Sequence, residues 1–266
     1  MIKIIQSEIN HKAESMSIKL NCDMGESFGI YSMGLDEQIM PYIDMANLAC
    51  GFHASDPVTM HQSIKSAVAH GVEIGVHPSY PDLVGFGRRD MTCSSEEIVS
   101  FVLYQLGALE ALCQSYGTRV SYLKPHGALY NAMMQDEEIF RSIAKAVSKY
   151  DTSIKLMILS SSKNKHYQNL AKKYDIELLY EIFADRAYTD KGFLVSREEK
   201  GAVITDRKQV IKRMKQLLKK GIIKSINGKK LKLQADTLCV HGDNQSALDL
   251  IEALAKLRDD HTDKLR

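Results

Sequence analysis

The sequence is poor in the residues that cross-link or interrupt a chain. Its 266 residues include five cysteines, five prolines and no tryptophan. The odd number of cysteines, with no Cys-x-x-Cys pair, argues against a disulfide framework and predicts reduced thiols in a cytoplasmic protein. All five prolines lie at or before position 125. The second half of the chain therefore lacks the residue that most often ends a helix.

Neither sign of charge dominates, and long apolar runs are missing. The 35 basic and 33 acidic residues leave a formal net charge of +2, which does not indicate a dedicated nucleic-acid-binding protein. No apolar run approaches the roughly 18 residues of a membrane span, and residues 1–17 lack the apolar core of a signal peptide. The hydrophobic fraction of 44% is ordinary for a globular protein. We therefore expect one large domain or two small ones, with neither a membrane nor a nucleic acid as partner.

Three common site motifs are also absent from the sequence. No Gly-x-Gly-x-x-Gly follows the first predicted strand, which weakens the case for a dinucleotide-binding fold. There is no Walker A phosphate loop and no Gly-x-Ser-x-Gly nucleophile turn. The sequence therefore does not locate a nucleotide.

Short β-rich runs alternate with longer helical patterns, which is typical of parallel β–α–β units. The predicted strands are 18–22, 43–50, 72–76, 119–124, 154–159, 176–183 and 237–241. The predicted helices are 57–70, 94–116, 136–149, 163–174, 206–220 and 245–258. Asn227-Gly228 predicts a hairpin with a type I′ turn within 222–236. Seven strands favour a closed or nearly closed β/α barrel, with an open doubly wound sheet as the alternative.

This pattern also suggests a domain organisation. We expect a polar N-terminal extension over 1–17, a single β/α barrel domain over 18–258 and a polar tail over 259–266.

Glycine-flanked ionisable residues follow six of the seven predicted strands. Because the carboxyl ends of parallel strands meet on one face of a barrel, where active sites lie, we expect these side chains to share one cleft. Taken singly, an Asp before a helix is usually an N-cap, and Asp56 before Pro57 fits that interpretation. Helix capping does not explain histidine at four of the seven strand ends. The strand-end residues are Asn21, Asp23, Glu26, His53, Asp56, His77, Lys124, His126, Asp185, Arg186, His241, Asp243 and Asn244.

One group within this set and one further loop suggest particular chemistry. Asp23, His53 and His77 offer one carboxylate and two imidazoles, a workable ligand set for Zn²⁺ or another divalent ion. Acid–base catalysis and oxyanion stabilisation by the same side chains are the alternative. The loop that carries Arg88 and Arg89 is rich in glycine and positive charge, which suits a carboxylate or phosphate but equally a surface turn.

Six blocks of sequence, in order, resemble the LamB/YcsF family, the A subunits of 5-oxoprolinase. The resemblance runs from about residue 18 to 258. Two positions depart from the family pattern, because Ser55 stands where glycine is expected and Gln245 where proline is common. Neither departure replaces an ionisable residue. The blocks are NCDMGESFG, CGFHASDP, GVHPSYPDLVGFGRR, LKPHGALYN, FADRAYTDKGFLVSR and VHGDN.

The resemblance implies both a fold and a reaction. The fold is a seven-stranded TIM-like β/α barrel of the glycoside hydrolase/deacetylase superfamily. The reaction is the opening of 5-oxo-L-proline (pyroglutamate) to L-glutamate by an ATP-dependent cyclic amide hydrolase, the 5-oxoprolinase, with ATP cleaved to ADP and phosphate and Mg²⁺ expected with it. The activity needs two partner proteins, subunits B and C. The relation to deacetylases, which use an Asp and two His, also favours a metal at Asp23, His53 and His77.

The chemistry of this reaction suggests roles for the strand-end residues. A lactam is a stable amide, so ATP could phosphorylate the lactam oxygen before water attacks C5. A base for water, donors for the developing charge and a second carboxylate that orients a histidine are then needed. The expected catalytic residues are Asp23, His53, His77, Lys124, His126, His241 and Asp243. The expected substrate-binding residues are Asn21, Glu26, Arg88, Arg89, Asp185 and Arg186.

Two other functions remain open from the sequence. One is a stand-alone metal-dependent amidohydrolase or deacetylase that acts on an N-acyl sugar without ATP or partners. The other is a non-catalytic subunit that binds pyroglutamate or ATP for its partners. Residues 207–232 contain eleven Lys/Arg and no acid, which leaves the rest of the chain with a net charge of −9. This basic stretch is either a solvated face or a docking surface for an acidic partner subunit or ATP phosphates.

Overall fold

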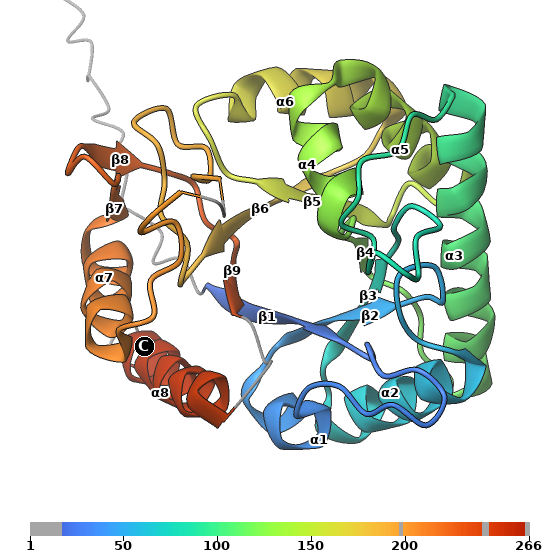
Figure 1. Ribbon diagram of the computed structural model, residues 1–266, viewed down its shortest axis with the longest axis horizontal. Coiled ribbons are helices and arrows are strands. Elements are labelled where there is room, and N and C mark those ends of the chain that lie inside the picture. The colour runs from blue at the N-terminus through green and yellow to red at the C-terminus, as the bar shows by residue number, and fades with distance from the viewer. Residues whose placement is uncertain (1–17, 197–198, 241–244, 264–266) are drawn as a thin grey trace, which may run out of the picture.

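Seven parallel strands form a closed barrel in the computed structural model, which describes residues 18–196, 199–240 and 245–263 (Figure 1). The strand order is β1-β2-β3-β4-β5-β6-β9, and β9 pairs with β1 to close the barrel. The closed barrel is confirmed, and the open doubly wound sheet is excluded. The strands are β1 (Lys19–Met24), β2 (Met45–Ala49), β3 (Glu73–His77), β4 (Tyr122–Leu123), β5 (Lys155–Leu159), β6 (Leu178–Phe183) and β9 (Thr237–Val240).

Helices surround the barrel on its outer side (Figure 1). Helix α4 was not predicted, because it begins directly at a strand end with His126 as an N-cap that makes no side-chain capping bond. Helix α8 runs past the predicted end at 258 to Asp263, so most of the predicted tail is helical; the predicted extension 1–17 lies outside the described residues. The α-helices are α1 (Asp36–Ile39), α2 (Pro57–His70), α3 (Ser95–Ser115), α4 (Gly127–Gln135), α5 (Glu137–Tyr150), α6 (Asn164–Ala171), α7 (Arg207–Lys220) and α8 (Gln245–Asp263), with 3₁₀ turns at Met40–Tyr42 and Lys172–Tyr174.

The predicted hairpin is present, but its turn type was wrong. Strands β7 (Ile222–Lys224) and β8 (Lys230–Lys232) pair antiparallel outside the barrel. The Gly228 N–H donates to the carbonyl of Ser225, and Gly228 is the one residue of the turn with a positive φ, 82°. A type I′ turn needs positive φ at two central residues, so this is the longer hairpin in which a type I turn is followed by a left-handed glycine. The basic stretch occupies α7 and this hairpin.

Alternation along each strand gives the barrel an apolar outer face and a polar interior. Outward residues such as Leu48, Val76 and Ile182 are fully buried in the main core beneath the helices. Toward the carboxyl ends the interior residues of neighbouring strands are polar, and β1 pairs with β2 so that Asp23 lies opposite Asn47. The polar side chains of the strands therefore face one another inside the barrel rather than solvent.

An apolar layer closes the interior near the amino ends of the strands. Met45, Tyr122 and Met157 form a separate buried cluster, and Leu179 packs against it. Gly75 of β3 makes room for this layer, because a Cβ there would overlap the ring of Tyr122. The layer separates the amino end of the barrel from the polar groups at the carboxyl end.

Helix α3 is the one helix in the described part of the chain that is long and apolar enough, by length and composition, to cross a membrane. In the fold it packs against α5, and its buried face, which includes Val102, Leu106 and Leu109, belongs to the main core. This packing accounts for the apolar composition of α3.

Candidate active site

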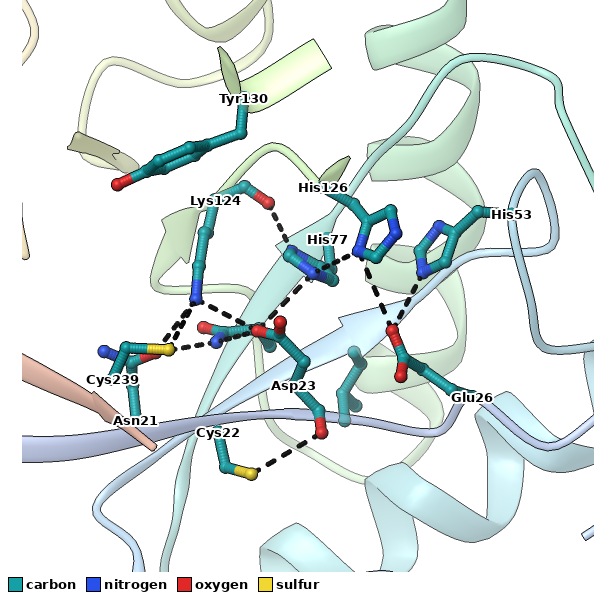
Figure 2. A network of polar contacts seen from close by, with 12 residues as sticks. Asn21, Cys22, Asp23, Glu26, His53, His77, Lys124, His126, Tyr130 and Cys239 are labelled. Carbon is teal, nitrogen blue, oxygen red and sulfur yellow. Dashed lines mark hydrogen bonds and ion pairs between the residues drawn. The ribbon is translucent and has the colours of Figure 1, made fainter. Parts of the chain in front are cut away.

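Lys124, which directly follows β4, lies at the centre of the polar network inside the barrel (Figure 2). Its ammonium is 3.0 Å from Asp23 Oδ1 and 2.8 Å from Glu181 Oε1, and it donates to Asn21 Oδ1 at 3.2 Å. Burial alone would lower the pKa of Lys124, but the carboxylates of Asp23 and Glu181 outweigh that cost and hold the pKa well above its ordinary value. Lys124 is therefore a fixed cation and not a base.

The amide of Asn47 holds Asp23 in place and links it to Asn21. Asn47 donates to Asp23 Oδ1 at 2.8 Å and to Asn21 Oδ1 at 2.9 Å, and its own oxygen accepts from the Tyr122 hydroxyl at 2.8 Å. Every member of this chain of hydrogen bonds therefore has a partner in the barrel interior. Asn21, predicted to bind substrate, lies within this support beneath the site.

Glu181 and Tyr130 belong to the site but were missed from the sequence. Glu181, in the middle of β6, is fully buried, and its Oε2 accepts from the Tyr130 hydroxyl at 2.7 Å. Glu181 has no flanking glycine and does not end a strand. The one available signal was a charged residue in an otherwise apolar run, because a buried carboxylate needs a buried cation as partner.

Three buried histidines lie beside this network (Figure 2). His77 Nδ1 is 2.6 Å from the carbonyl of Lys124, and His126 Nε2 is 2.9 Å from the carbonyl of Phe86. His77 Nε2 and His126 Nδ1 face each other at 3.0 Å. His77 Nε2 is also 3.4 Å from Asp23 Oδ1, which joins the histidines to the lysine network.

Glu26 and His53 complete the histidine group. Glu26 Oε1 is 3.3 Å from His53 Nε2 and 3.7 Å from His126 Nδ1, and the rings of His53 and His126 stack at 3.7 Å. Burial and the neighbouring His77 lower the pKa of His126 to about 3, and burial lowers the pKa of His53 well below its usual range. Both rings are thus neutral at physiological pH. One ligand atom from each of Glu26, His53, His77 and His126 lies within 4.8 Å of the others, so this group could hold a metal ion.

The loop between β3 and α3 covers the histidines. Phe86 of this loop makes edge contacts with the rings of His53 and His126. Gly87 has φ 62°, and a Cβ there would lie 2.8 Å from His53 Cβ and 2.9 Å from His126 Cδ2. The glycine therefore lets the backbone approach the imidazoles closely.

A cavity of about 570 Å³ opens above Lys124 at the carboxyl ends of the strands. Of the predicted substrate-binding residues, Arg88 and Arg186 line it. Arg186 is buried and donates to the carbonyls of Val195 and Ala202. Residues that line the cavity include Asp23, His77, Arg88, Lys124, His126, Tyr130, Phe183 and Arg186.

Other predicted site residues do not line this cavity, although Glu26 lies in the histidine group beside it. Arg89 pairs with Asp82 and does not line the cavity, and neither do Glu26 and Asp185. His241 and Asp243, with Asn244, lie outside the described residues. Asp56 is the N-cap of α2, accepting from Val58 N and Thr59 N, as the simpler interpretation of the sequence expected.

The fold and the site together define a parallel β/α-barrel protein whose buried, charged site lies at the carboxyl ends of the strands. The sequence pattern of the LamB/YcsF family matches residues 18–265. The chain therefore belongs to the LamB/YcsF family.

Relatives in this family are similar over nearly their whole length. The 5-oxoprolinase A subunit of Vibrio parahaemolyticus is 49% identical over 237 residues, covering 89% of this chain and 94% of that protein. The Pseudomonas aeruginosa 5-oxoprolinase A subunit that is numbered 3 is also 49% identical, with coverage of 89% and 94%. A crystal structure of the lactam utilization protein from Thermus thermophilus has a TM-score of 0.86 at 38% identity, covering 92% of this chain and 97% of that one.

Proposed function

We propose that this chain is a subunit of an ATP-dependent 5-oxoprolinase that hydrolyses 5-oxo-L-proline to L-glutamate in the cytoplasm. ATP, with Mg²⁺, is the co-substrate and is cleaved to ADP and phosphate. The observation that carries the proposal is a buried lysine cation, paired with Asp23 and Glu181, on the wall of a cavity at the barrel mouth. The names of the relatives and of the Thermus thermophilus lactam utilization protein supply the substrate class.

The cavity offers complementary charge to both ends of this substrate. 5-Oxo-L-proline carries one carboxylate and one lactam carbonyl. Arg186 and Arg88 line the cavity and would receive the carboxylate, for which a planar guanidinium is well suited. Lys124 would then face the carbonyl oxygen, where negative charge develops.

The reaction needs activation because a five-membered lactam is a poor electrophile. Transfer of the ATP γ-phosphoryl group to the lactam oxygen gives an imidate ester that water attacks at C5. Asp23 would take the proton from that water, and the ring opens as the C5–N bond breaks and nitrogen takes up a proton, which leaves an acyl phosphate at C5. A second water would then hydrolyse this acyl phosphate, giving the side-chain carboxylate of glutamate and releasing phosphate. The further candidate catalytic residues are His53, His77, His126, His241 and Asp243.

Partner subunits B and C would complete this site. The loops 25–35 and 78–94 follow β1 and β3 at the mouth and expose apolar side chains, with Ile30 92% and Val84 91% accessible. Exposed apolar groups beside a site are typical of a protein-binding surface. We therefore propose that a partner docks on this apolar rim. The rim consists of Phe28, Ile30, Tyr31, Met33, Leu83, Val84 and Met91.

Two sets of variants distinguish docking on the apolar rim from docking on the basic surface of α7 and β7–β8. Replacing Ile30 by Glu should weaken assembly with subunits B and C, as measured by co-purification. Replacing Lys212 and Lys215, both exposed on α7, by Glu should leave assembly intact. The reverse result would move the interface to the basic surface.

A glutamate-release assay tests the function. The chain with subunits B and C should form glutamate only when ATP is present, and Asp23→Asn should slow the reaction at least about 100-fold. If no glutamate forms when all components are present, the proposed function is contradicted. Deacetylation of an N-acyl sugar without ATP or partners would instead support a stand-alone metal-dependent amidohydrolase, the candidate that the group of Glu26 and three histidines favours.

A further inference from the structure

Hydrogen bonding to the backbone fixes the tautomers of two of the buried histidines. The carbonyls of Lys124 and Phe86 can only accept, so His77 Nδ1 and His126 Nε2 must carry the hydrogens. When each ring carries only that one hydrogen, the remaining nitrogens, His77 Nε2 and His126 Nδ1, both present a lone pair. They face each other at 3.0 Å, where two acceptors cannot form a hydrogen bond.

A bound cation would satisfy these two lone pairs at once. Two nitrogens that each lie about 2.1 Å from one ion, at an angle between those of octahedral and tetrahedral coordination, are roughly 3.0–3.4 Å apart. The observed separation falls at the short end of this range. An imidazole that binds a metal through one nitrogen usually donates its other N–H to a carbonyl or carboxylate, as both rings do here.

Glu26 supplies a carboxylate to the same point. Its Oε1 lies 3.7 Å from His126 Nδ1 and 3.3 Å from His53 Nε2. His53 stacks parallel to His126, with an angle of 4° between the rings, so the two rings do not direct lone pairs in their planes at one point. His53 is thus better placed to donate to Glu26 and orient it than to bind the ion itself.

The predicted ligand Asp23 fits this site less well. Its Oδ1 already accepts from Lys124 and Asn47, at 3.0 and 2.8 Å. Asp23 therefore forms an ion pair with Lys124, and it lies between the Lys124 ammonium and His77 Nε2. The negative charge of Asp23 would therefore reduce the repulsion between the Lys124 ammonium and a positive ion at the histidines.

We infer that Glu26, His77 and His126 bind one divalent transition-metal ion, with His53 as a positioning residue for Glu26. Two imidazoles and one carboxylate suit Zn²⁺, Mn²⁺, Fe²⁺ or Ni²⁺ better than Mg²⁺ or Ca²⁺, which prefer all-oxygen ligands. His77 and His126 line the cavity, so an ion held there would be reached from the substrate side. The inference concerns the metal alone and goes beyond the proposed reaction.

Metal binding can be measured on the whole chain without ATP, partners or substrate. The purified protein would be stripped with a chelator, reloaded with Zn²⁺, and analysed by elemental analysis and by titration calorimetry. A parallel titration with Co²⁺ would follow the visible absorption that the ion gains on binding nitrogen ligands. We expect one ion per chain in each experiment.

Variants identify the ligands. Glu26→Gln and His126→Gln should each weaken Zn²⁺ binding by more than about 100-fold, and His53→Gln by about 10- to 100-fold, as expected for a residue that orients a ligand. The matched control is His166→Gln, on exposed α6 beside Glu137, which should bind as wild type does. Glu26 is partly exposed, so its variant should remain folded even if His126→Gln does not.

Wild-type protein that takes up no metal would overturn the inference, since the two histidines would then share a proton. Equal binding by wild type and Glu26→Gln, both folded by circular dichroism, would overturn it as well. A chain that binds the ion but releases no glutamate in the complete assay would contradict the proposed function and leave the metal site standing. Glutamate release by metal-free protein would support the proposed function and would exclude a catalytic use of the ion.

Discussion

The two ends of the barrel contain cavities of nearly equal size but of opposite character. The cavity at the carboxyl ends measures about 570 Å³, and the one at the amino ends about 560 Å³. Both are lined by charged residues. At the amino end Lys19 pairs with Glu73, and both side chains are more than 40% exposed. At the carboxyl end Lys124 and Glu181 pair with side chains 4% and 0% exposed.

Burial of the charged groups, and not cavity volume, therefore distinguishes the end that we propose to be the functional one. Solvated ion pairs cost little and contribute little. A buried lysine between two carboxylates, next to three buried histidines, carries a desolvation cost that a barrel core of apolar residues would avoid. Such a cost is typical of sites where chemistry needs the charge. The apolar layer of Met45, Tyr122, Met157 and Leu179 keeps the two ends apart.

The largest expected effect follows from removing the central cation. Lys124→Met leaves Asp23 and Glu181 without their partner, so glutamate release should fall at least about 100-fold. The free energy of unfolding should fall by about 3–5 kcal/mol, because an uncompensated charge stays buried. Urea unfolding and the glutamate assay measure both.

The control for Lys124→Met is Lys155→Met at the amino end, where Lys155 is 45% exposed and pairs with Glu177. It should change stability by less than about 1 kcal/mol and leave activity unchanged. Equal losses in the two variants would remove the distinction between the ends.

A second prediction concerns a substitution that disrupts the apolar layer between the two ends. Gly75→Ala places a Cβ against the ring of Tyr122. The free energy of unfolding should fall by about 1–3 kcal/mol, as for other overpacked cores. Gly107→Ala in α3, where a Cβ meets nothing within 4 Å, is the matched control and should stabilise the protein by about 0.5–1 kcal/mol. Chemical denaturation of both variants decides the matter, and a tolerated Ala at position 75 would contradict the packing described for the layer.

A third prediction concerns the loops that shape the carboxyl end. Asp56 caps α2 and also accepts from Gly29 N in the loop after β1. The N–H of Gly29 and then that of Thr59 lower the pKa of Asp56 to about 2 from 3.8. Since the folded pKa is depressed, the stabilisation is present above the ordinary value and is lost as pH falls through about 2.

Asp56→Ala should therefore cost about 1 kcal/mol at neutral pH, and the difference from wild type should shrink as the pH drops below about 4. Asp56→Asn keeps the cap without the charge and should show a smaller loss with little dependence on pH. Thermal unfolding across this pH range gives the comparison. A gap between Asp56→Ala and wild type that grows on acidification would contradict the assigned role.

The smallest effect is expected at the amino end. Lys19→Met combined with Glu73→Gln removes an exposed ion pair. Stability should change by less than about 1 kcal/mol, and glutamate release should be unaffected. A large loss of activity in this double variant would show that the amino-end cavity takes part in function.

Local patterns in the sequence predicted most of the barrel and the greater part of the polar network at its carboxyl end. The seven strands follow from alternating β and helical runs, and Asp23, His53, His77, Lys124 and His126 from glycine-flanked strand ends, which the fold brings together. Glu181 could not be predicted in the same way, because its role depends on which face of β6 turns inward and on Lys124 from another strand. The pairing of Glu26 with the histidines depends likewise on contacts between different strand-end loops.

The predictions of the short elements failed for a related reason. Helix α4 begins at a strand end without a capping side chain, so it carries no start signal. The type of the hairpin turn depends on the φ of Asn227, which the Asn-Gly pair alone does not determine. The residues predicted to bind substrate do not all lie at the cavity. Arg89 pairs with Asp82 in its own loop, whereas Arg88 and Arg186 line the cavity.

The most direct test of the central claim is a crystal structure of the chain, assembled with subunits B and C, in the presence of 5-oxo-L-proline. The account predicts density for the lactam in the carboxyl-end cavity, with its carbonyl oxygen toward Lys124 and its carboxylate toward Arg186 or Arg88. Density for the lactam in the cavity between Lys19, Glu73 and Lys155, with the carboxyl-end cavity free of it, would contradict the account.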